Sequence, residues 1–189
     1  ILLGFALLIA LGFEFVNGFH DTATSIATVV ATKVLSPAKA VMLAAVMNLI
    51  GAFWGTAVAK TIASGLVDTD VVNVTSQVLI CTLLGAIVWN LLTWWLGLPS
   101  SSSHALLGGF AGAALAKAGP SSIILAGWIK PIVGIVLSPL LGMTLGLLLS
   151  VTFSWALWKR DARTLDRFFR RAQLVSAGFY SLAHGSNDA

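Results

Sequence analysis

The stretch Glu14–Thr24, which reads EFVNGFHDTAT, places two acids, an amide and an imidazole inside an otherwise apolar segment. Residues 1–13 before it and 25–32 after it carry no charge. Such groups are costly in an apolar setting unless they face a cavity, a ligand or a neighbouring helix. In a helix they would share one face, because the polar positions recur at steps of three and four: Glu14, Asn17, Asp21, Thr24 and Thr28. Gly18 interrupts this stripe, and we expect the helix to kink or unwind there. The alternative is a polar patch that only joins two helices.

The composition is that of a polytopic membrane protein. Hydrophobic residues make up 58% of the 189 residues and charged residues only 10%, whereas a soluble domain carries about a quarter charged residues. The net charge of +4 is concentrated in one short segment, so it does not indicate nucleic-acid binding. The single Cys81 excludes a disulfide framework and a cysteine-based metal site. We expect no cofactor, and no residue is identified with certainty as a metal ligand.

The polar motif recurs near the end of the chain. GFHD at residues 18–21 and GSND at residues 185–188 share the pattern Gly-x-(His or Asn)-Asp and lie 167 residues apart. Duplicated units with broken helices at matching positions are a common plan of secondary transporters. We therefore expect an all-α polytopic membrane protein of the inverted-repeat transporter class. Its parts would be a first transmembrane repeat (1–158), a basic cytoplasmic loop (159–171) and the truncated start of a second repeat (172–189).

The charge pattern predicts a topology. The segment 159–171 holds six basic and two acidic residues, which places it in the cytoplasm together with the Lys33–Lys39 turn, and residues 63–73 outside. An odd number of crossings must then separate residue 74 from residue 158. Residues 99–130 would supply one net crossing, with or without a re-entrant hairpin, and a short apolar piece would end at Lys130-Pro131. The expected spans are 1–32, 40–62, 74–98 and 132–158.

Four consecutive serines follow Pro99, which ends the preceding helix. They are Ser100, Ser101, Ser102 and Ser103. Serine is a favoured helix N-cap, and the free N–H groups of a helix start bind oxyanions. One serine is enough for a cap, whereas four supply additional hydroxyl donors. We interpret this stretch as an anion-binding, re-entrant loop; the alternative is capping and helix packing.

Acids in a membrane must hold cations, so Asp21 and Asp188 would bind protons, Na⁺ or a metal ion. An anion moving inward against an interior-negative potential costs about 2.3 kcal/mol per charge per 100 mV, which co-transported cations cancel. No arginine lies in the expected spans, so an anion would be held by hydroxyls, amides and helix ends. The residues thus predict an anion symporter.

Three motifs resemble the signatures of the PiT family of inorganic phosphate transporters: NGFHDTA (17–23), LPSSSSHA (98–105) and HGSNDA (184–189). They follow the family's order, and the resemblance covers the chain from end to end, most like the bacterial low-affinity branch. It implies inverted repeats that meet at a mid-membrane phosphate site in a multi-pass cell-membrane protein that is not an enzyme. The substrate-binding residues it implies are Asn17, Thr22, Ser100, Ser101, Ser102, Ser103 and Asn187.

Cation or proton coupling is assigned to Glu14, His20, Asp21 and Asp188. His20 stands where many Na⁺-coupled members have Asn, and Thr24 likewise replaces a usual Asn, which weakens the case for Na⁺. An imidazole titrates near neutral pH, so proton coupling is the preferred hypothesis, including transport of a metal–phosphate complex. A hydrogen bond of His20 across helices is the alternative role, and Na⁺-coupled transport or a sulfate carrier are the alternative functions. His104 and His184 are expected to orient other groups.

A membrane hydrolase is disfavoured because no Gly-x-Ser-x-Gly motif is present, and a passive channel because paired motifs suit alternating access. The expected partners are inorganic phosphate, a co-transported proton or Na⁺ and the lipid bilayer, with no nucleic acid and with a homo-oligomer left open. We expect the chain to be part of a longer protein whose second Ser/Thr loop lies beyond residue 189, and not to transport alone.

Overall fold

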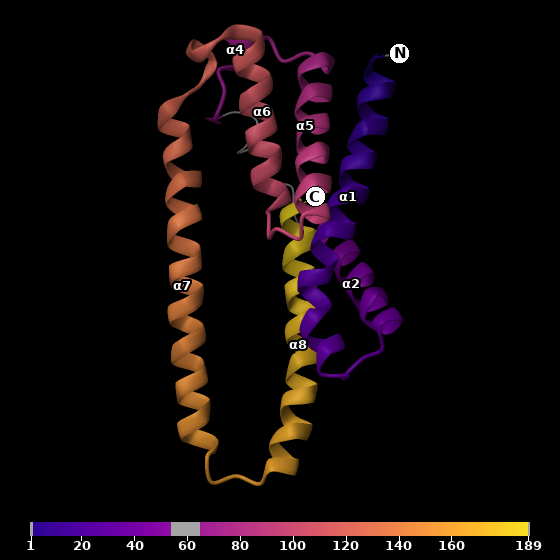
Figure 1. The fold of residues 1–189 in the computed structure, drawn as a ribbon, viewed down its shortest axis with the longest axis vertical. Coiled ribbons are helices and arrows are strands. Elements are labelled where there is room, and N and C mark those ends of the chain that lie inside the picture. The colour runs from indigo at the N-terminus through magenta and orange to yellow at the C-terminus, as the bar shows by residue number, and fades with distance from the viewer. Residues whose placement is uncertain (1, 54–64, 189) are drawn as a thin grey trace.

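The computed structural model describes residues 2–53 and 65–188, and this part of the chain is almost entirely helical (Figure 1). The expected all-α fold is confirmed. The helices are α1 (Leu2–Ala31), α2 (Pro37–Ala52), α4 (Thr69–Val72), α5 (Ser76–Trp95), α6 (Ser102–Ala118), the 3₁₀ turn η1 (Pro120–Ser122), α7 (Leu125–Leu157) and α8 (Ala162–Asp188). The expected span 40–62 is helical to residue 52, and its part from 54 onward lies outside the described residues.

Three of these helices, α1, α5 and α7, are long and apolar enough to cross a membrane. Most large apolar side chains are exposed along them, which is what a helix surrounded by lipid requires. The buried apolar residues form small clusters where helices meet. One cluster joins Phe13 of α1 to Ala86 of α5 and Ala105 of α6, and another joins Val29, Ala40 and Ala177 of α1, α2 and α8. The protein is an integral membrane protein.

The α5–α6 pair is a hairpin whose tip carries the serine run and lies partway along the length of α7 (Figure 1). The hairpin returns to the end from which it started, and α7 then runs to the opposite end. This path satisfies the expected odd number of crossings between residues 74 and 158, with the hairpin as the re-entrant element. Ser101 caps the start of α6 by accepting from the His104 backbone N–H, and Gly119, at φ 75°, ends that helix.

One expected boundary is wrong. The apolar piece before Lys130-Pro131 is not separate, because α7 continues through Pro131 and Pro139. Membrane helices tolerate internal proline when nearby groups satisfy the freed backbone carbonyls. None of the residues of α7 is buried, and Figure 1 shows this helix standing apart from the α1–α2–α5–α8 bundle.

The helices α2 and α8 pack closely against each other. Asn48 lies against Gly185, and Gly51 against Leu182, in each case with backbone atoms so close that a Cβ on the glycine would collide. Small residues permit this approach in membrane helices. Residues that lie far apart in the sequence are thereby brought side by side.

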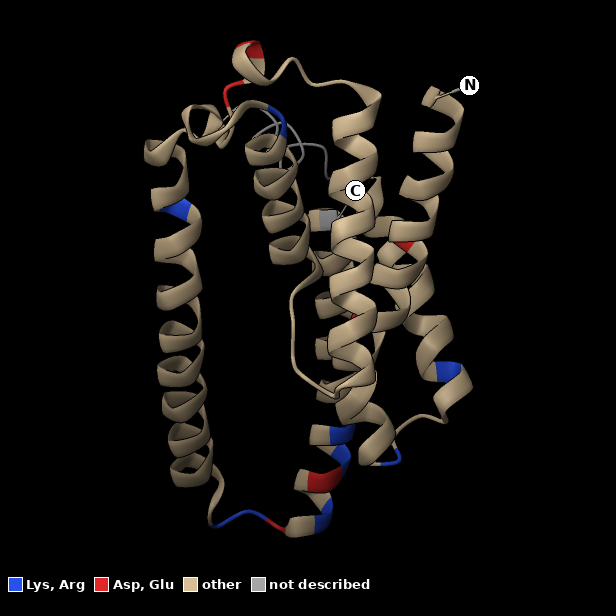
Figure 2. Ribbon diagram, turned by 45° about the horizontal axis from the view of Figure 1, so that its top comes forward, with Lys and Arg blue, Asp and Glu red and all other residues tan. Residues whose placement is uncertain are grey.

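The charged residues lie mainly at the ends of the molecule. Figure 2 shows basic residues concentrated where α7 joins α8, with the acidic residues of α4 at the opposite end, in agreement with the topology expected from the sequence. The basic segment 159–171 is a loop only as far as Asp161; from Ala162 it forms the first turns of α8.

Candidate functional site

Three elements bring polar side chains to the carboxylate of Asp21, where α1, α8 and the tip of the α5–α6 hairpin meet (Figure 1). His20 Nδ1 lies 2.8 Å from Asp21 Oδ1. Ser102 Oγ donates to Asp21 Oδ2 over 3.1 Å, and His184 Nε2 lies 3.5 Å from the same oxygen. Both carboxylate oxygens are thus engaged, so the side chain is held by its own neighbour, by the serine loop and by the second polar motif.

A cavity of about 280 Å³ lies beside this carboxylate. It is lined by Asp21, Thr24, Ser100, Ser101, Ser103, Tyr180, His184 and Asn187. The described lining residues include no Lys or Arg, so an anion here would be bound by hydroxyl, amide and backbone N–H groups. The start of α6 opens at the same place and contributes the positive end of its helix dipole.

The hydroxyls of the serine run are not all committed to the protein. Ser100 Oγ accepts from Trp89 Nε1 over 3.1 Å, and Ser101 Oγ accepts from the His104 backbone N–H over 3.4 Å. An accepting hydroxyl keeps its proton free to donate. Ser103 lines the cavity as well. Three hydroxyl donors are therefore available to a ligand, while Ser102 donates to Asp21.

A second cavity, of about 440 Å³, lies between α1, α2 and α8, and His184 lines both cavities. Its lining residues are Glu14, Asn17, Gly18, Thr22, Ala45, Asn48, Leu49, Ala52, His184 and Gly185. Carboxylate and amide oxygens predominate among its polar groups, which suits a cation better than an anion.

The expected break in the first segment is wrong, because α1 is continuous from Leu2 to Ala31. The hydroxyls near Gly18 bond back to their own helix. Thr22 donates to the Gly18 carbonyl, and Ser25 donates to the Thr22 carbonyl over 2.9 Å. Such bonds satisfy polar side chains without unwinding the helix.

The structure divides the site residues predicted from the sequence into groups. Asp21, the serine run and Asn187 meet at the first cavity, and His20 contacts Asp21. Asn17 and Thr22, expected beside the serines, line the second cavity together with Glu14. The side chain of Asp188 lies outside the described residues.

Sequence reasoning missed three residues at these cavities. Asn48 Oδ1 lies 3.1 Å from His184 Nδ1, Tyr180 lines the first cavity, and Trp89 bonds to Ser100. Asn48 is an amide within an apolar segment, the same signal that drew attention to Asn17. Trp89 lies in an apolar segment, and tryptophan is common at membrane interfaces, so its sequence context does not reveal the bond to Ser100.

Comparison with known proteins places the chain among transporters. The sequence pattern of the phosphate transporter family matches residues 17–189. A probable low-affinity inorganic phosphate transporter of Rhizobium meliloti is 49% identical over 96% of this chain and 54% of its own length. Another of Streptomyces halstedii is 45% identical over 95% of this chain and 84% of its own length.

A more distant relative is also a phosphate transporter by name, and a solved structure has a similar fold. The low-affinity inorganic phosphate transporter PitA of Escherichia coli is 35% identical over 98% of this chain and 44% of its own length. A solved structure, titled the sodium-dependent phosphate transporter, shares the fold with a TM-score of 0.71 at 19% identity, over 95% of this chain and 55% of that one. The chain thus spans about half the length of most of these relatives. On the family match, this chain belongs to the phosphate transporter family.

Proposed function

We propose that this chain forms part of an inorganic phosphate transporter and that phosphate binds in the cavity beside Asp21. The observation that carries this proposal is the meeting of the serine run with Asp21 and Asn187 around one cavity, whose described lining residues include no lysine or arginine. Monoprotonated phosphate both accepts and donates hydrogen bonds. The hydroxyls of Ser100, Ser101 and Ser103 suit its oxygens, and Asp21 suits its proton. Sulfate lacks that proton and would be repelled by the carboxylate.

We propose further that transport is coupled to protons through His20, Asp21 and His184. Both ring nitrogens of His184 face oxygens, since Nδ1 lies 3.1 Å from Asn48 Oδ1 and Nε2 lies 3.5 Å from Asp21 Oδ2. Only the protonated imidazole donates from both nitrogens. Protonation of His184 therefore favours this arrangement, and its loss weakens a contact between α8 and α1. Such a link between proton binding and helix contact is what symport requires. Transport of a metal–phosphate complex is compatible with the same site.

The competing proposal is coupling to Na⁺ in the second cavity. Glu14, Asn17 and Asn48 line it with oxygen-bearing side chains, and the solved structure of similar fold is titled a sodium-dependent phosphate transporter. The first proposal places the proton on His184 beside Asp21, and the second places Na⁺ on the oxygens of the second cavity. The two proposals therefore predict different sensitive residues.

Uptake of radiolabelled phosphate by the full-length protein in proteoliposomes separates them. We expect a pH gradient to drive uptake, His184→Gln to abolish that stimulation, and Asn17→Ala, a change in the second cavity, to leave much of it. Uptake driven by Na⁺ alone and lost in Asn17→Ala would replace proton coupling by Na⁺ coupling. Accumulation of sulfate in place of phosphate would overturn the substrate assignment.

A further inference from the structure

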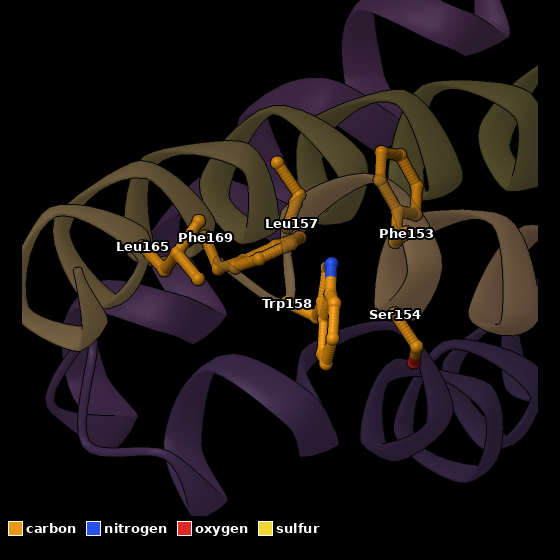
Figure 3. Close-up of a pocket in the computed structure, with 6 residues that line it drawn as sticks. All are labelled: Phe153, Ser154, Leu157, Trp158, Leu165 and Phe169. Atoms are coloured by element: carbon orange, nitrogen blue, oxygen red, sulfur yellow. The ribbon is translucent and has the colours of Figure 1, made fainter. Parts of the chain in front are cut away.

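A cavity of about 380 Å³ lies at the junction of α7 and α8 (Figure 3). The proposed phosphate site lies near the other end of α8, where His184 and Asn187 line its cavity. The cavity at the junction is lined by Phe153, Ser154, Leu157, Trp158, Leu165 and Phe169. The rings of Phe153 and Phe169 meet edge to face at 5.9 Å and join its two helices. Figure 3 shows the Trp158 ring between Phe169 and Ser154. Five of the six lining residues are apolar or aromatic, so the cavity suits a hydrocarbon chain.

The sequence around this cavity indicates its depth in the membrane. The segment 132–157 is uncharged, and charges begin at Lys159 immediately after Trp158. Trp155 and Trp158 are 84% and 77% exposed, as expected of tryptophans at the interface between hydrocarbon and headgroups. A second hollow of about 430 Å³ lies on the Trp155 side of Trp158. The cavity therefore opens at the depth where a lipid's acyl chains meet its headgroup.

The adjacent segment has a surplus of positive charge. The segment 159–171 contains six basic residues and only two acidic ones. Within the described part of the chain it forms one ion pair, between Arg170 and Asp166 at 2.8 Å. Asp161 accepts from the Thr164 backbone N–H and so caps α8. Lys159 Nζ lies 5.4 Å from the centre of the Trp158 ring, directly at the cavity wall. Figure 2 shows this concentration of basic residues at the α7–α8 junction.

We propose that this junction is a binding site for an anionic glycerophospholipid. One acyl chain occupies the aromatic cavity, and the headgroup phosphate is held by Lys159, Arg160 and Arg163 at its rim. An apolar wall ending in unpaired cations matches a lipid tail followed by an anionic head. Free inorganic phosphate would leave the cavity unfilled. Occupancy would tie α7 to the start of α8, the helix that carries His184 and Asn187 near its other end.

Native mass spectrometry of the full-length protein, loaded with phosphatidylglycerol or phosphatidylcholine, tests the site without requiring transport. Wild type should retain phosphatidylglycerol preferentially. Replacing Lys159, Arg160 and Arg163 together by Gln should reduce its retention about 100-fold, at about fivefold per charge. The matched control replaces Lys33, Lys39 and Lys130 by Gln, which removes as many charges away from the cavity, and should keep the preference.

Equal losses in the two triple variants would overturn the proposal, because they would indicate general surface attraction. Equal retention of the two lipids by wild type would overturn it as well. A photo-reactive benzoylphenylalanine placed at position 158 supplies a second readout. It should cross-link to phospholipid; cross-linking to a protein segment would show that another part of the assembly fills the cavity. Phosphate transport enters neither measurement, so the two proposals fail independently.

Discussion

The helices α1 and α7 have similar length and apolarity, yet they satisfy polar groups in different ways. They contain 30 and 33 residues, and both are able to cross a membrane. On α7, which buries no residue, the hydroxyls of Ser138 and Thr144 bond to carbonyls of their own helix. On α1, the carboxylate of Asp21 takes partners from α6 and α8. Hydroxyls are satisfied locally, whereas a carboxylate needs partners from other helices, and this requirement locates the functional site.

The largest expected effect is that of removing the Asp21 charge. Asp21→Asn keeps the shape but loses the carboxylate that Ser102 and His184 contact, and we expect phosphate uptake to fall about 100-fold. Initial uptake rates in proteoliposomes measure this. Asp70→Asn, the same replacement at an exposed position, should leave uptake unchanged, and equal rates for both variants would remove Asp21 from the site.

The next effect concerns the packing that holds α8 in place. A methyl group at Gly185 would collide with the backbone of Asn48, so Gly185→Ala should destabilise the protein by about 1–3 kcal/mol. Gly142 on α7 has open space around it, and Gly142→Ala should be neutral or stabilising by about 0.5–1 kcal/mol. Thermal unfolding of the full-length protein in detergent compares the two. Equal shifts in Tm would show that α7 is as tightly packed as α8.

A smaller effect is expected from a single serine of the loop. Ser103→Ala removes one hydroxyl donor from the cavity and should weaken phosphate binding about tenfold. Calorimetric titration of the purified protein measures this affinity. Ser121→Ala, an exposed serine beyond α6, serves as its control, and the same affinity in both variants would contradict the role of Ser103.

The smallest effect is expected on α7. Ser138→Ala on α7 removes a hydroxyl that bonds only to the Gly134 carbonyl of the same helix. Its removal leaves no buried group unpaired, so stability should change by less than about 0.5 kcal/mol and uptake should be unaffected. A marked loss of uptake would show that α7 has a functional partner at this position.

Apolar length, a local signal, predicted the helical class, and the resemblance to a transporter family predicted that the two polar motifs meet. Sequence reasoning failed at Gly18 and Pro131, where each residue was read as a break although the helix continues. Both residues permit a break, but the backbone bonds around them decide whether one forms. Local sequence does not carry that information.

The division of the site residues could not be predicted either. Asn17 and Asp21 lie one turn apart and were expected on one face of a helix, but they line different cavities. Which cavity a side chain faces depends on the rotation of α1 against α2 and α8. The contact of Asn48 with Gly185 fixes α2 against α8, and no local pattern reveals that contact.

Equilibrium binding of radiolabelled phosphate to the purified full-length protein tests whether phosphate binds beside Asp21. Wild type and Asp70→Asn should bind phosphate alike, Asp21→Asn should bind it far more weakly, and unlabelled sulfate should compete poorly. Undiminished binding in Asp21→Asn, or displacement of phosphate by equimolar sulfate, would contradict a phosphate site built around Asp21.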